Sequence, residues 1–96
     1  MRRDEVLCIL RAHWSEIQAF GVKSLSLFGS VARDEATAES DIDVLAEFKG
    51  PATFDGYTGL MIFLEDLLRR KIDLVTPAGI KPRLQPYIDR DLLRVA

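Results

Sequence analysis

Apolar residues recur every three or four positions through the first twenty residues, which is the spacing of one helix face. The pattern predicts one amphipathic helix ending at Gly21, because glycine readily takes the left-handed conformation that closes a helix. Residues 22–28 and 41–48 instead alternate between two faces, and residues 72–75 form a short apolar run, so these stretches predict three strands. The helix face consists of Val6, Ile9, Leu10, His13, Trp14, Ile17 and Phe20.

Further helical segments complete the pattern. A short helical turn is predicted after the first strand, and a second amphipathic helix lies between the second and third strands. Helical turns are predicted from about Ile80 through Leu92 and Leu93. This order of elements predicts an α/β (α+β) fold with a small mixed three-stranded sheet flanked by helices, in one domain over residues 1–96. The pairing order of the strands does not follow from the pattern.

The composition is that of an ordinary globular domain, with 48% hydrophobic and 29% charged residues. The net charge of −2 argues against a nucleic-acid partner, which usually requires a clearly basic domain. Cys8 is the only cysteine, so neither a disulfide framework nor a cysteine zinc site is predicted. No apolar run reaches the roughly 20 residues that a membrane span needs. We therefore expect a cytoplasmic protein without a membrane segment.

Three aspartates carry the candidate chemistry. Residues two apart in a strand share a face and lie roughly 6.6 Å apart, so Asp41 and Asp43 should point the same way. Asp73, in the third predicted strand, can join them if the two strands are neighbours. Carboxylate oxygens gathered on one side suit Mg²⁺ or Mn²⁺, and carboxylates from two strands could hold two ions. Each aspartate taken alone is equally typical of a solvated strand end.

A glycine–serine pair follows the first predicted strand. Gly29 permits close approach of a ligand to the backbone, and Ser30 adds a hydroxyl donor where the next helical turn begins. Arg33, one turn later, can bind an anion through two N–H groups. The pair alone is also typical of an ordinary turn with a serine cap. In combination with the aspartates it predicts a site for a nucleoside triphosphate and its metal ions, although no P-loop motif is present.

At these residues the chain resembles the minimal nucleotidyltransferases (MNT domains) of the DNA polymerase beta-type superfamily. The resemblance is carried by F-G-S-V-A-R at residues 28–33 and S-D-I-D-V-L at residues 40–45. K-I-D-L-V at residues 71–75 is similar to the strand that bears the family's third carboxylate. The match spans roughly residues 20–95, and the combined motif is far more specific than its parts.

The resemblance implies a role for each matching residue. Gly29 and Ser30 would hold the triphosphate of ATP, with Arg33 supporting it. Asp41 and Asp43 would bind two Mg²⁺ ions, for which Mn²⁺ is an alternative. Asp73 would complete one metal site and help to deprotonate the attacking hydroxyl. Attack on the α-phosphorus would release pyrophosphate and leave a nucleoside monophosphate on the acceptor.

The resemblance also implies a partner. Minimal domains of this kind are commonly paired with a small HEPN-domain toxin, for which the MNT protein is the antitoxin and, in some pairs, adenylylates a tyrosine. The expected function is therefore Mg²⁺-dependent transfer of AMP from ATP to a hydroxyl of a HEPN-type toxin. Two features in which the sequence departs from the family's pattern argue against full activity. Asp34 stands where many members of the family have glycine, and the sequence lacks the additional domain with which larger relatives bind nucleoside or acceptor.

Two other functions stay open on the sequence alone. The chain could be a non-catalytic antitoxin that neutralises its partner by covering it, with a residual nucleotide site. It could also transfer a nucleotide to RNA or to a small molecule such as an aminoglycoside, although its low basicity and short chain argue against both. Base preference and homo- or hetero-oligomerisation are not decided by the sequence.

Overall fold

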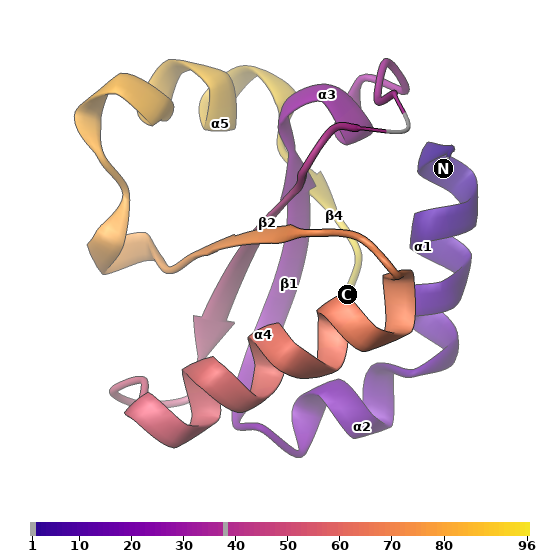
Figure 1. The fold of residues 1–96 in the computed structure, drawn as a ribbon. Helices are drawn as coiled ribbons and strands as arrows, with labels where there is room; N and C mark the ends of the chain where they lie inside the picture. Colours follow the sequence, from indigo (N-terminus) through magenta and orange to yellow (C-terminus); the bar gives the residue numbers. More distant parts are fainter. Residues whose placement is uncertain (1, 38) are drawn as a thin grey trace.

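The computed structural model describes residues 2–37 and 39–96, so Met1 and Ala38 (the latter in the predicted polar loop) lie outside the described residues. Strands occupy the middle of the molecule and helices surround them (Figure 1). The elements in chain order are α1 (Arg3–Ala12), α2 (Trp14–Gln18), β1 (Val22–Phe28), α3 (Gly29–Ala32), β2 (Ile42–Phe48), α4 (Phe54–Leu68), β3 (Ile72–Val75), the 3₁₀ turns η1 (Pro77–Gly79) and η2 (Pro82–Leu84), α5 (Gln85–Asp91) and β4 (Leu93–Arg94).

The described strands form one mixed sheet in the order β3-β2-β1-β4. β1 runs antiparallel to both β2 and β4, whereas β2 runs parallel to β3. The predicted fold class is confirmed, but the predicted number of strands is wrong, because the described residues form four and not three. The missing strand is β4, in the tail that was predicted to be helical. Two residues are too few to show an alternating pattern, and β4 exists because it pairs with β1 at Leu27↔Leu93.

The first predicted helix is also corrected. It is divided at His13, which ends α1 and precedes α2 with φ −108° and ψ 19°. The apolar spacing conceals the division because both halves contribute buried residues to the same core, Leu10 from α1 and Ile17 from α2. At the start of β1 the register shifts between Val22 and Ser24, so that Val22 joins this core as well.

The two faces of the sheet have different environments. On one face, Leu25 and Leu27 of β1 and Val44 of β2 are fully buried with side chains of α1, α2 and α4. The opposite face carries Asp43, and its partner across β1 is Phe28. α5 packs against β1 and α3, and in Figure 1 α3 and α5 lie at the same end of the strands. The fold therefore leaves the candidate aspartates on the face that the main core does not occupy.

No helix in residues 2–37 and 39–96 combines the length and the apolar character that crossing a bilayer requires.

Candidate active site

Gly29 lies at the junction of β1 and α3, directly beside the carboxylate of Asp43. Its φ is +72°, in the left-handed region that favours glycine. A Cβ atom built on Gly29 would lie 2.1 Å from Oδ2 of Asp43, far inside contact distance. Glycine is therefore required here twice, by the backbone conformation and by the close approach of β2. The sequence predicted a close approach to the backbone at Gly29, but neither its positive φ nor the contact with Asp43.

Asp43 and Asp73 come together because β2 and β3 are parallel neighbours and the two residues are register partners. Hydrogen bonding with the Asp73 side chain is one of the effects that raise the pKa of Asp43, and Asp43 is half-buried. Burial, together with the negative charges of Asp73 and Asp41, raises the pKa of Asp43 to about 6, against an opposing effect of Arg33. Asp43 is thus partly buried and close to two other carboxylates, and a bound cation would relieve the repulsion between them.

Asp41 is less closely held than the other two aspartates. It precedes β2, is exposed, and acts on Asp43 through its charge. Within residues 2–37 and 39–96, no three or more His, Cys, Asp or Glu side chains gather in an arrangement that could hold a metal ion. Mg²⁺, however, is usually bound by one or two carboxylates together with substrate phosphates and water. The Asp43–Asp73 pair fits that requirement, with Asp41 as a neighbouring third oxygen donor.

Ser30 is the second residue of α3 and is half-buried. Its backbone carbonyl accepts a hydrogen bond from the N–H of Glu35 at 2.8 Å, which closes the turn. Its hydroxyl has no hydrogen-bond partner among the described residues, so this donor remains available to a ligand beside Gly29.

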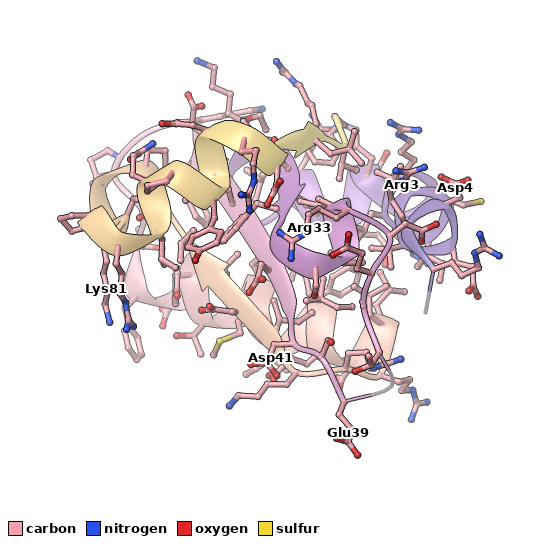
Figure 2. All side chains as sticks on the ribbon, turned by 90° about the horizontal axis from the view of Figure 1, so that it is seen from above. Arg3, Asp4, Arg33, Glu39, Asp41 and Lys81 are labelled. Carbon is pink, nitrogen blue, oxygen red and sulfur yellow. The ribbon has the colours of Figure 1, made fainter. Side chains whose placement is uncertain are left out.

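Arg33 extends from the end of α3 and lies against α5 (Figure 2). Its Nε donates to Glu35 Oε2 at 3.1 Å, and its Nη1 donates to Asp91 Oδ2 at 2.5 Å. These two carboxylates raise the pKa of Arg33 above its ordinary value, which keeps the group charged. Sequence reasoning identified Arg33 but missed both partners, since nothing in the local pattern links it to Asp91.

Asp34 does not carry a free charge into the site. It has φ 60°, a left-handed conformation that explains why glycine suits this position in the family that the chain resembles. Its Oδ1 accepts the backbone N–H of Arg3 at 2.9 Å, and its Oδ2 pairs with Arg2 at 3.5 Å. The hydrogen bond from Arg3 and the charge of Arg2 lower the pKa of Asp34. Asp34 therefore caps the start of α1.

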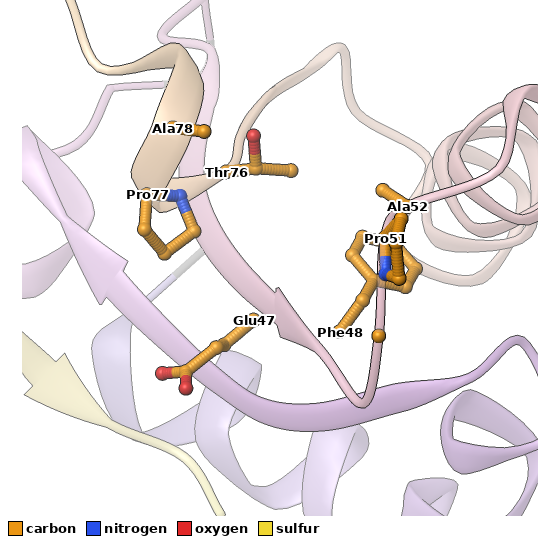
Figure 3. Close-up of a pocket in the computed structure, with 8 residues that line it drawn as sticks. Glu47, Phe48, Pro51, Ala52, Thr76, Pro77 and Ala78 are labelled. Atoms are coloured by element: carbon orange, nitrogen blue, oxygen red, sulfur yellow. The ribbon is translucent and has the colours of Figure 1, made fainter.

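A hollow of about 250 Å³ lies at the other end of β2 and β3, between η1 and the loop before α4 (Figure 3). The sequence left open whether that loop borders the site. The hollow lies at the C-terminal ends of the two strands, whereas Asp43 and Asp73 lie near their beginnings. It is lined by Glu47, Phe48, Gly50, Pro51, Ala52, Thr76, Pro77 and Ala78.

Residues 6–94 match the nucleotidyltransferase domain family. A candidate protein adenylyltransferase of Methanocaldococcus jannaschii is 41% identical over 96 residues, covering 96% of each chain. The protein adenylyltransferase MntA of Thermococcus cleftensis is 33% identical over 93 residues, covering 96% of this chain and 94% of that relative.

Solved structures agree with this assignment. A candidate minimal nucleotidyltransferase superposes with a TM-score of 0.81 at 32% identity, covering 97% of this chain and 95% of the other. Two more distant structures share the fold. One is a toxin–antitoxin with AMP-PNP, with a TM-score of 0.71 at 17% identity, covering 90% of this chain and 72% of that one. The other is a tri-AMPylated Shewanella oneidensis HEPN toxin in complex with an MNT antitoxin, with a TM-score of 0.66 at 15% identity, covering 94% and 71%.

The expected enzyme class and the resemblance are thereby confirmed. The family match extends over nearly the whole chain, and the relatives exceed 30% identity along almost their full length. The chain is a nucleotidyltransferase and belongs to the nucleotidyltransferase domain family.

Proposed function

We propose that residues 1–96 act as a single minimal nucleotidyltransferase domain in the cytoplasm, which transfers AMP from ATP to a tyrosine hydroxyl of a HEPN-type toxin and serves as its antitoxin. One observation carries the proposal: Gly29 leaves no room for a side chain beside Asp43, and Asp43 is paired with Asp73. A backbone open to phosphates and a carboxylate pair suited to a cation are thus in direct contact. The names of the relatives support adenylylation of a protein, and the toxin complexes of similar fold support the partner.

The proposed chemistry assigns a task to each residue. Gly29 and Ser30 would bind the triphosphate, and Arg33 would support it. Mg²⁺, or Mn²⁺ in its place, would be held by Asp41, Asp43 and Asp73 as two ions and would neutralise charge that develops on the phosphates.

Asp73 would accept the proton of the attacking hydroxyl. The acceptor oxygen then bonds to the α-phosphorus, the bond from that phosphorus to the β-phosphate bridging oxygen breaks, and pyrophosphate leaves. Positioning and charge neutralisation, the main sources of catalysis in such transfers, are what this site offers.

The test is the intact mass of a HEPN-type partner after incubation with this chain, Mg²⁺ and each nucleoside triphosphate in turn. We expect an increase of one or more AMP moieties with ATP, abolished by Asp43→Asn. The matched control is Asp66→Asn, which makes the same change at an exposed position on α4 and should leave transfer intact. A stable complex whose mass never changes would reject the transferase and favour an antitoxin that acts by covering its partner.

A further inference from the structure

The guanidinium of Arg33 is held on one side and open on the other. Glu35 occupies Nε, and Asp91 occupies one hydrogen of Nη1. A guanidinium has five N–H donors in a rigid plane, so three remain, one on Nη1 and two on Nη2. No other residue in 2–37 and 39–96 accepts a hydrogen bond from them. These donors form the edge of the guanidinium that binds the paired oxygens of a phosphate.

Asp91 occupies an unfavourable place for a carboxylate. It is the last residue of α5, where the helix dipole disfavours a negative charge, and its side chain is only 5% exposed. A buried carboxylate is costly unless it is paired and hydrogen-bonded. Both oxygens are satisfied, Oδ1 by Arg90 Nε at 3.1 Å and Oδ2 by Arg33 and by Arg90 Nη2 at 3.4 Å.

The two arginines that hold Asp91 differ in what they could reach. The side chain of Arg90 is 62% exposed and that of Arg33 is 33% exposed. Only Arg33 lies close enough to the carboxylate site for its charge to act on Asp43. The buried carboxylate of Asp91 thus fixes an arginine whose charge acts on Asp43, and it does so from α5, which packs against α3.

We propose that Asp91 is a positioning residue that holds Arg33 with its Nη1–Nη2 edge available to the phosphates of the bound nucleotide. The inference rests on the proposed function, because it assumes a triphosphate beside Gly29. Asp91 itself does not touch the nucleotide. It acts through Arg33, and it ties α5 to the nucleotide site.

A double-mutant cycle measured as the dissociation constant for Mg²⁺–ATP tests this role. Asp91→Asn should weaken binding about 3- to 30-fold, which lies within the range typical of directly coupled residues. In the background of Arg33→Ala the same substitution should cause no further loss. Asp89→Asn, on the same helix but exposed and with its side chain bonded to Gln85, is the matched control and should bind as the wild type does.

Other results would overturn the inference. Additive losses in the cycle would mean that Asp91 acts independently of Arg33, and tighter binding by Asp91→Asn would mean that Asp91 competes with the nucleotide for Arg33. If Asp91→Asn fails to fold, Asp91→Glu keeps the charge but displaces it, and its smaller loss should likewise vanish without Arg33. If the wild type binds no Mg²⁺–ATP, the proposed function fails and this inference falls with it, whereas binding with an additive cycle rejects this inference alone.

Discussion

At the scale of single residues, Gly29 and Asp43 constrain each other. The aspartate stands where any Cβ on residue 29 would collide with it, and the positive φ of Gly29 lets the chain turn away from β1. A substitution at either position therefore tests the same contact from opposite sides.

Gly29→Ala should both destabilise the protein and abolish nucleotide transfer. The methyl group must displace the Asp43 carboxylate, and the left-handed conformation costs alanine about 1–2 kcal/mol. Urea unfolding and the partner-mass assay measure the two effects. Gly50→Ala is the control, because a Cβ there meets nothing within 4 Å and no positive φ is involved. Similar behaviour of the two variants would contradict a role for the close contact.

Asp43 should impose a pH dependence on the stability of the metal-free protein. Its pKa is about 6 in the folded chain and 3.8 in the unfolded one, so the folded state binds more protons between these values. Stability from this group is complete below about pH 3.8 and is lost as the pH rises through 6. The melting temperature of Asp43→Asn should therefore rise relative to that of the wild type as the pH increases from 4 to 7, because the amide does not ionise.

The control for this pH profile is Asp66→Asn, whose difference from the wild type should stay flat across the same range. Mg²⁺ should reduce the difference for Asp43→Asn at pH 7, since a cation favours the ionised carboxylates. A difference that does not change with pH would show that Asp43 titrates normally.

At the scale of elements, the alternating pattern predicted the strands that position the site. Ile42 and Val44 are buried in the core, as the pattern required, which leaves Asp43 on the opposite face. To predict that Asp43 pairs with Asp73, one must also know that β2 and β3 are parallel neighbours in the sheet. No local sequence signal gives that information. β4 escaped prediction for the same reason, because its existence depends on β1 and not on its own two residues.

Val95→Ala should show that the tail is part of the fold. Val95 is 5% exposed, and its N–H donates to the carbonyl of Leu25 at 2.8 Å. Removing two buried methyl groups should lower the free energy of unfolding by about 1–3 kcal/mol. Leu92→Ala, nearby but 48% exposed, should change it by about 0.5 kcal/mol or less. Equal effects in urea unfolding would mean that the tail does not pack as described.

At the scale of the whole molecule, the contacts that the sequence could not reveal are those between distant segments. Arg33 meets Asp91 across 58 positions, and Asp34 meets the start of α1 across 31. Both pairs involve charged residues that are individually ordinary, and only the folded chain brings them together. Local motifs thus predicted the residues of the candidate site, whereas tertiary contacts decide which partners hold Arg33 and Asp34.

An experiment on the intact chain can decide whether it neutralises a HEPN-type partner by catalysis or by binding to it and covering its surface. A transferase releases its modified product and acts again, so wild-type chain with Mg²⁺ and ATP should neutralise several molar equivalents of partner. Asp43→Asn should neutralise at most one equivalent, because it lacks the carboxylate on which the proposed metal site depends. Titration of partner toxicity against chain, with and without ATP, measures the ratio. Asp66→Asn should match the wild type, and a one-to-one requirement for the wild type would reject catalysis as the mode of neutralisation.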